Sequence, residues 1–290
     1  MDLLGITTAL LSALSMGTVG IFAKMTGLGA EVITFFRLGL GAIFMLLALV
    51  FTGRTRYLCC WPSWPVLING VLLAGFIIFY VQAMQFTTMA NAIMLIYLAP
   101  PLAALYAHFF LGERINLFGA GCIGLALAGC ALMMELRLEL DSGSRHSLGI
   151  GLGLLSTLCY ASFILINRTI APEIHIATRT LYQLLTGALV MLPLCLWSRP
   201  HLPVSLWPLL VGVGLIPGFL GILCAVVALS RLPAATFGTL AYMEPIAVVI
   251  FGWALFAETL STMQLAGCLL IILSGIGMSC CPAPPPPPPN

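Results

Sequence analysis

A single carboxylate stands within an otherwise apolar segment in the second half of the chain. Glu244 lies near the middle of residues 234–257, which carry no other charged side chain. A charged side chain at the centre of a membrane helix costs about 2.5–3.5 kcal/mol, and such residues commonly serve a substrate or a proton. We therefore predict that Glu244 binds the ammonium group of a substrate or carries a proton. A packing role, through a hydrogen bond to a neighbouring helix, is the alternative.

The residues around Glu244 belong to a pattern that occurs twice. Tyr97 and Pro100 are matched, 145 residues later, by Tyr242 and Pro245. A proline inside a helix removes a main-chain hydrogen bond, so both prolines are predicted to kink their helices. The carbonyl freed four residues earlier would serve a ligand or water, unless the kink is static. Both tyrosines lie too deep to anchor at a membrane surface, and we predict that they contact substrate.

Further polar side chains within apolar segments are candidates for substrate binding, with hydrogen bonds between helices as the alternative. They are Asn91, Thr236, Gln82 and Tyr160. Arg37 lies a little more than a turn inside its segment and is expected to extend to the lipid headgroups; pairing with Glu31 or with a substrate carboxylate is the other possibility. Glu113 ends an apolar segment and is expected to cap the short turn that follows it.

Helices that cross a membrane must position these residues. A crossing needs roughly 20 mostly apolar residues, and charges, prolines and turn residues mark where each one ends. Hydrophobicity predicts ten spans, at 4–23, 32–52, 66–85, 89–111, 117–135, 148–167, 178–197, 206–230, 234–257 and 262–280.

The two halves of the chain are similar to each other. Besides the tyrosine and proline pattern, Glu113 recurs as Glu258 at the same offset. Each half holds five spans, an odd number, so the second copy enters the membrane in the opposite orientation. Inverted repeats of this kind are frequent in transporters. We predict a first repeat at 1–140, an inverted second repeat at 147–280 and a disordered proline-rich tail at 281–290.

The composition indicates a membrane protein and argues against other classes. Hydrophobic residues make up 61% of the chain and charged residues 7%, whereas soluble domains carry about 25% charged residues. No basic patch favours nucleic acid, and the cysteines and histidines show no metal-ligand spacing. No catalytic motif is visible, so we predict no cofactor, no metal and no enzymatic activity. Gly119, Gly121 and Gly124 fit a dinucleotide pattern but lie in an apolar helix, which favours close helix packing instead.

The duplicated pattern resembles the ten-helix, EamA-type branch of the drug/metabolite transporter superfamily. The motifs that carry the resemblance are Phe36-Arg37-Leu38, Ala90-Asn91-Ala92, Leu111-Gly112-Glu113-Arg114 and the stretch 234–245. The resemblance covers nearly the whole chain apart from the proline-rich tail. It implies a basket of ten helices around a central cavity in the bacterial inner membrane. It also implies export of small metabolites without ATP, and residues 236–245 are similar to members that export amino acids.

Taken together, the sequence predicts a secondary transporter that exports small organic metabolites, amino acids or related compounds, by alternating access. Its predicted partners are a small-molecule substrate, the lipid bilayer and protons exchanged at Glu244. An importer or facilitator, or a drug exporter, of the same fold is one alternative, and a membrane-embedded enzyme or scaffold is another. Lysine and arginine are slightly more frequent in the connections that lie on the same side of the membrane as the N-terminus, which favours both termini in the cytoplasm.

Overall fold

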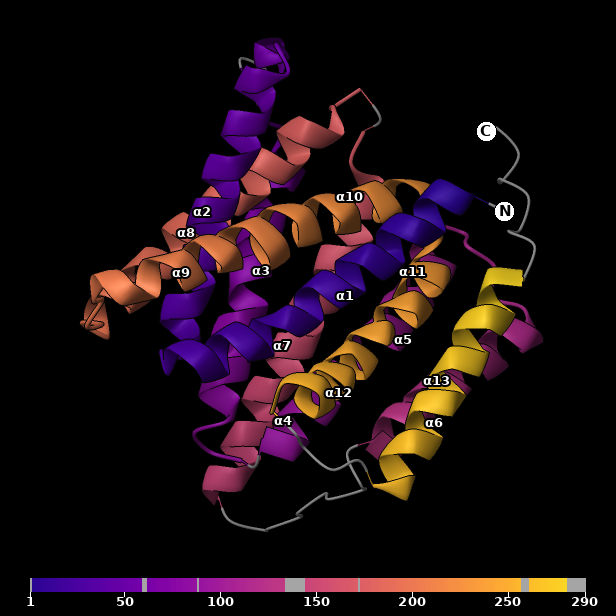
Figure 1. The fold of residues 1–290 in the computed structure, drawn as a ribbon. Helices are drawn as coiled ribbons and strands as arrows, with labels where there is room; N and C mark the ends of the chain where they lie inside the picture. Colours follow the sequence, from indigo (N-terminus) through magenta and orange to yellow (C-terminus); the bar gives the residue numbers. More distant parts are fainter. Residues whose placement is uncertain are drawn as a thin grey trace.

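The computed structural model of the chain is a bundle of helices that cross one another at various angles (Figure 1). It describes residues 2–58, 62–87, 89–133, 144–171, 173–256 and 261–280. The proline-rich tail, Glu258 and residues 134–143, near the junction of the predicted repeats, lie outside these ranges. Throughout the described ranges every regular element is helical, which confirms the predicted all-α class.

The first half contributes five spans, the fourth of which is divided in two. After α2 a short 3-10 turn, η1 (Thr55–Tyr57), leads toward the third span. The helices are α1 (Leu3–Thr26), α2 (Ala30–Phe51), α3 (Trp64–Ala83), α4 (Met89–Ile96) with α5 (Ala99–Phe110), and α6 (Leu117–Met133).

The second half repeats this plan with more interruptions. Its helices are α7 (Ser144–Thr169), α8 (Ile176–Trp197), the 3-10 turn η2 (Val204–Leu206), α9 (Trp207–Val213), the π-helical η3 (Gly214–Leu220), α10 (Gly221–Arg231), α11 (Ala234–Ala241), α12 (Met243–Phe256) and α13 (Thr262–Cys280). Among the described residues, nine helical segments are long and apolar enough to cross a membrane, and α6 is a shorter apolar helix. The ten predicted spans are therefore all present as helices.

Helix α7 begins earlier than predicted, at Ser144 and not at 148. Its first turn is polar, which is why hydrophobicity misplaces the start. The buried His146 explains the difference, because its Nδ1 lies 3.2 Å from the Thr87 hydroxyl. This contact with a distant part of the chain gives the polar turn a partner that local sequence does not show.

The two halves are interleaved, and the pattern of contacts repeats between them. Helix α3 packs against α7 and α8, and its counterpart in the second half, formed by η3 and α10, packs against α2 and α1. Other large contacts join counterpart spans directly, namely α2 with α8, α6 with α13, and the fourth span with the ninth through α5 and α11. Packing contacts exchanged in this way are expected of two inverted five-helix repeats that are related by an axis.

Glycines in η3 seat helix α2 against the second half. Pro217 lacks the N–H that an α-helix needs at this point, and the chain takes a π-helical turn around it. A Cβ atom on Gly218 would collide with the Arg37 carbonyl oxygen, and one on Gly214 would collide with the Leu40 side chain. The two glycines therefore allow the main chain of α2 to approach closely at the turn that carries Arg37.

Helices α6 and α13 form a pair at one side of the bundle (Figure 1). Their closest approach is at Gly129 and Gly267, where a Cβ on Gly129 would lie 2.8 Å from the Gly267 carbonyl oxygen. The predicted packing role of Gly121 and Gly124 is wrong, because a Cβ on either would meet open space. Helix α6 does pack through a small residue, but that residue is Gly129, which lies outside the predicted pattern.

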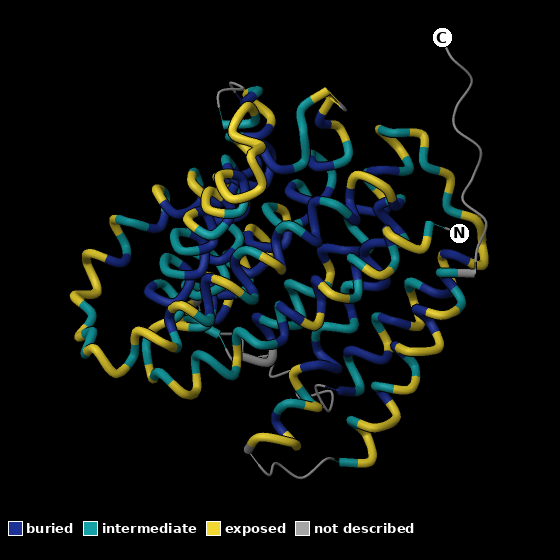
Figure 2. The backbone as a smooth tube through the Cα atoms, turned by 45° about the horizontal axis from the view of Figure 1, so that its top comes forward, coloured by how far each residue is buried: buried dark blue, intermediate teal, exposed yellow. Residues whose placement is uncertain are grey.

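The outer surface of the bundle is apolar. Exposed residues lie along the outward faces of the helices, and buried ones lie between them (Figure 2). Large hydrophobic side chains such as Phe51, Phe110 and Leu273 are among the exposed residues. A surface of this kind is suited to contact with lipid chains and would be unfavourable in water.

Glu113 ties three helices together at one end of the bundle, called here the Glu113 end. Its Oε1 accepts hydrogen bonds from Arg168, at 2.6 Å from Nη2 and 2.9 Å from Nε. Its Oε2 accepts from the main-chain N–H of Ala234 at 2.8 Å, at the start of α11. The predicted capping of the adjacent turn is wrong. The carboxylate instead caps a distant helix, whose positive N-terminal end favours a negative charge.

We predict that breaking the Glu113–Arg168 ion pair loosens the start of α11. In Arg168→Gln, the amides of residues 234–237 should exchange hydrogen about fivefold faster, because a partly exposed ion pair contributes about 1 kcal/mol. Hydrogen exchange measured by mass spectrometry on the detergent-solubilised protein tests this. Arg145→Gln, at an exposed position on the first turn of α7, is the matched control. Equal exchange in both variants would contradict the assigned role.

We also predict that Gly238 is needed where α11 crosses α5. A Cβ atom on Gly238 would lie 2.8 Å from the Pro100 Cβ, and the proline ring cannot rotate away. Gly238→Val should lower the unfolding free energy by about 1–3 kcal/mol through overpacking, seen as a lower melting temperature in detergent. Gly151→Val is the control, because a Cβ on Gly151 meets open space. A melting temperature unchanged in both variants would show that the crossing tolerates the extra atoms.

Candidate functional site

Two interrupted helices meet at the centre of the bundle. The fourth span breaks between α4 and α5 at Tyr97, shortly before Pro100, and the ninth breaks between α11 and α12 at Tyr242, shortly before Pro245. Each break is short, and it interrupts the regular helix inside the bundle. Interrupted helices are characteristic of transporter binding sites, where irregular main chain is tolerated.

One hydrogen bond joins the two breaks. The Tyr242 hydroxyl donates to the main-chain carbonyl oxygen of Tyr97 at 2.5 Å, and the two rings lie 5.8 Å apart. This carbonyl would normally accept from the residue four positions later, but that residue is Pro101, which has no N–H. The prediction from the sequence concerns Pro100, whereas Pro101 is the residue that deprives this carbonyl of its donor. Because Tyr97 and Tyr242 are repeat counterparts, their contact lies close to the axis that relates the repeats.

Glu244 lies in the first turn of α12, directly after the break. The side chain is half-buried, and it interacts electrostatically with the Arg37 guanidinium and with the hydroxyls of Tyr80, Tyr97 and Tyr160. These five residues are called the polar centre below. They come from α2, α3, the fourth-span break, α7 and α12. The positive N-terminal end of α12 stabilises the carboxylate there.

Arg37 does not extend to the headgroups, and that expectation is wrong. Its side chain is buried, and Nη1 lies 3.9 Å from the Met16 sulfur. In the described part of the chain, Nε has no hydrogen-bond partner, and no direct ion pair joins Arg37 to Glu244 or to Glu31. The close approach of α2 to Gly218 holds the arginine at this depth. A buried donor without a partner in the protein is available to water or to a ligand oxygen.

Tyr160 is held in the polar centre by its neighbours on α3. Its ring stacks on Phe76 with the centroids 5.0 Å apart. One turn earlier on α7, the Ser156 hydroxyl donates to the Phe76 carbonyl oxygen at 2.5 Å. These contacts fix α7 against α3, so that the Tyr160 ring lies beside both charged residues of the centre.

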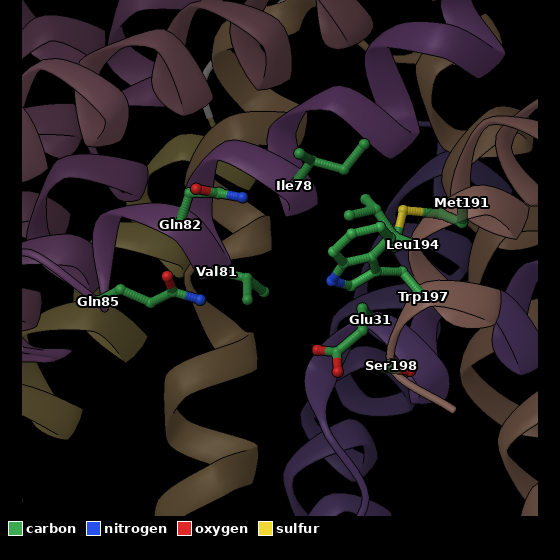
Figure 3. Close-up of a pocket in the computed structure, with 9 residues that line it drawn as sticks. All are labelled: Glu31, Ile78, Val81, Gln82, Gln85, Met191, Leu194, Trp197 and Ser198. Carbon is green, nitrogen blue, oxygen red and sulfur yellow. The ribbon is translucent and has the colours of Figure 1, made fainter. Parts of the chain in front are cut away.

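Three predicted binding residues lie away from the polar centre. The Asn91 amide nitrogen donates to Thr87 at 3.1 Å, and the same Thr87 hydroxyl meets His146. Thr236 is half-buried in the first turn of α11, near the Glu113 end. Gln82 lines a separate recess beside Glu31 (Figure 3). The structure therefore brings together Glu244, Tyr97, Tyr160 and Tyr242 and separates the other three.

Three members of the surroundings of Glu244 were not predicted as site residues. Tyr80 of α3 and Cys130 of α6 both lie within electrostatic range of its carboxylate, and Arg37 is the third. The signal for Arg37 was present, since a charge within a membrane span usually faces a partner of opposite charge. Tyr80 and Cys130 carried no comparable signal. In the described residues, no group of three or more metal-ligating side chains occurs.

Comparison with known proteins gives concordant results. The model of the EamA-like transporter family matches residues 3–135 and 147–280. An uncharacterized transporter of Archaeoglobus fulgidus is 29% identical, over 92% of this chain and 93% of its own. The pseudopaline exporter CntI of Pseudomonas aeruginosa is 27% identical over 96% and 98%. The threonine/homoserine exporter RhtA of Escherichia coli is 28% identical over 86% and 81%.

A solved structure, titled "Crystal structure of protein", superposes with a TM-score of 0.84 at 21% identity. The alignment covers 94% of this chain and 95% of that one. At this level of identity the likeness concerns the fold alone. It agrees with the interleaved arrangement of ten helical spans described above.

We predict that the hydroxyl of Tyr242 stabilises the break in the fourth span. Tyr242→Phe leaves the partly buried Tyr97 carbonyl without its donor, which should lower the unfolding free energy by about 1–3 kcal/mol. Tyr97→Phe is the matched control, because the acceptor is main chain and the hydrogen bond survives. Thermal melting of both variants in detergent measures the difference. Equal melting temperatures of the two variants would contradict the prediction, because they would show that water replaces the lost hydrogen bond.

Proposed function

Because the chain belongs to the EamA-like transporter family, we propose that it exports small zwitterionic amino compounds, amino acids or close relatives, by alternating access. Membership of the family makes the protein a multi-pass membrane transporter. The export direction, the substrate class and the coupling are the parts that we propose. Two of the similar proteins are named as exporters, one of threonine and homoserine and one of pseudopaline.

One observation supports the proposed class of substrate. The polar centre holds a buried arginine and a half-buried glutamate that interact electrostatically but form no direct ion pair with each other. Within the described residues, Arg37 Nε has no other partner. An amino acid fits such a pair, because its carboxylate would accept from Arg37 while its ammonium donates to Glu244. The surrounding tyrosines supply hydrogen bonds and ring surfaces for the side chain.

Proton coupling would follow from competition at Glu244. A carboxylate that has bound a proton is neutral and can no longer attract an ammonium group, so the proton and the substrate exclude each other. A transporter with this site exchanges one for the other across the membrane. We propose this exchange as the driving force for export, with Glu244 as the residue that changes partners.

Alternating access requires that each end of the bundle open in turn. The Glu113 end is held by the contacts of Glu113 with Arg168 and Ala234, and by an ion pair of 3.3 Å between Asp2 and Arg231. We propose that these contacts close one side of the pathway and that they break when it opens. The interleaved repeats support this, because two similar halves can exchange conformations.

We further propose that both termini lie in the cytoplasm of a bacterial cell, with the protein in the inner membrane. This follows from the excess of lysine and arginine in the connections on that side. The Glu113 end would then be cytoplasmic and the Glu31 end would face outward. The repeats would span 1–140 and 147–280, in keeping with the two segments that the family model matches.

A second candidate function keeps the fold and changes the cargo or the direction. The relative named as a pseudopaline exporter supports a different metabolite, and an importer, a facilitator or a drug exporter would use the same bundle. Counterflow in sealed vesicles separates the possible cargoes. An exporter of amino acids accelerates exchange of labelled threonine, whereas a protein for another cargo leaves that exchange at the background rate.

We predict that both charges of the polar centre are needed for transport. Glu244→Gln and Arg37→Gln should each reduce threonine exchange in proteoliposomes by at least about tenfold, because a charge-assisted hydrogen bond exceeds 1.4 kcal/mol. Glu173→Gln and Arg145→Gln, at exposed positions, are the controls. Lowering the pH should weaken threonine binding to the wild type and leave any residual binding to Glu244→Gln unchanged. Normal exchange with unaltered pH dependence in Glu244→Gln would overturn the proposal.

A further inference from the structure

A recess opens at the Glu31 end, the end of the bundle opposite Glu113. Its volume is about 340 Å³, and its walls come from the start of α2 and the C-terminal ends of α3 and α8. None of the five residues of the polar centre lines it. Two of its residues, Ile78 and Gln82, lie one turn apart on α3, and Gln85 follows in the turn after that helix. The recess is therefore lined by residues other than those of the polar centre.

The recess has an apolar floor and a polar rim. Ile78 and the buried Met191 form part of the floor. Figure 3 shows the amide of Gln82 on one side of the gap, facing the carboxylate of Glu31 and the indole nitrogen of Trp197 on the other. Throughout the described residues, none of these three rim side chains has a hydrogen-bond or ion-pair partner. Their polar atoms are therefore available to a ligand.

The charge of the recess selects the class of ligand. Glu31 is the only charged residue among those that line it, and it is negative. A volume of this size is at the small end of the range for sites that hold small molecules, about 300–1,000 Å³. A cation that donates hydrogen bonds suits an unpaired carboxylate, and the ring of Trp197 offers a further surface for it. The floor accepts a short hydrocarbon group attached to that cation.

We propose that this recess binds a primary ammonium group that carries a short apolar substituent. The ammonium donates to Glu31, the Gln82 amide oxygen accepts from it, and the substituent lies on Met191. Two sources can supply this chemistry. One is a soluble amino compound, such as the cargo of the proposed function, and the other is the ethanolamine headgroup of a phospholipid. The shared feature is the primary ammonium, and binding does not depend on Glu244.

The fluorescence of Trp197 provides the test. Purified protein is titrated with n-butylammonium chloride, and the signal of Trp197 is identified by its loss in Trp197→Phe. We expect a saturable change with n-butylammonium, none with n-butanol, and an affinity at least about tenfold lower in Glu31→Gln. Glu31→Asp keeps the negative charge on a side chain that is shorter by one methylene group, and should give an intermediate loss of affinity. Glu173→Gln and Glu244→Gln should bind as the wild type does.

A second arm separates the two sources. The same titration with n-butylammonium is repeated in nanodiscs of phosphatidylcholine and of phosphatidylethanolamine. Binding that is equal in both lipids assigns the recess to soluble amines, whereas competition by phosphatidylethanolamine assigns it to the headgroup. Either result supports the proposal. A Trp197 signal that does not saturate, or affinities that are equal in wild type, Glu31→Asp and Glu31→Gln, would overturn it. The result with Glu244→Gln keeps this outcome distinct from failure of the proposed transport function.

Discussion

In a lipid bilayer, every main-chain N–H and C=O must find a partner within the protein. The centre of this bundle is organised by the places where prolines break that rule. Pro101 leaves the Tyr97 carbonyl without its helical donor, and the hydroxyl of Tyr242 takes the vacant position. The interruption of the ninth span likewise places Glu244 at the start of a helix. The same irregularities that cost hydrogen bonds thus create the helix ends at which charge can be held.

The ten spans and their duplication could be predicted from the sequence. The spans depend on hydrophobicity averaged over about 20 residues, and the duplication is visible in a few rare residues that recur. The sequence also drew attention to Glu244, since an acid in an apolar segment is conspicuous in any arrangement. The partners of that acid were harder to find. Whether Arg37 extends outward or inward depends on how closely α2 approaches Gly218. That approach is a property of packing between distant segments, and hydropathy cannot show it.

The same reason explains why the sequence alone does not locate the other polar residues. Asn91 and Gln82 are polar residues near helix ends, and a linear reading cannot decide which face of the bundle they reach. In the structure, Asn91 bonds with Thr87 and Gln82 lines the recess. Glu113 is predicted from the sequence to cap its own turn, and it caps α11 at Ala234 instead. In each case the residue type was informative, and its partner was fixed by tertiary structure.

The interleaving of the two halves bears on how such a chain could have arisen. The large contacts join α3 to α7, α2 to α8 and α6 to α13, so neither half completes its packing alone. A five-span ancestor with an equally weak charge bias would have inserted in both orientations. Two oppositely inserted copies would have met as an antiparallel dimer with the contacts seen here. Gene fusion would then have fixed the orientation of each copy and allowed the two to diverge, with Glu244 in one half and Ala99 in the other.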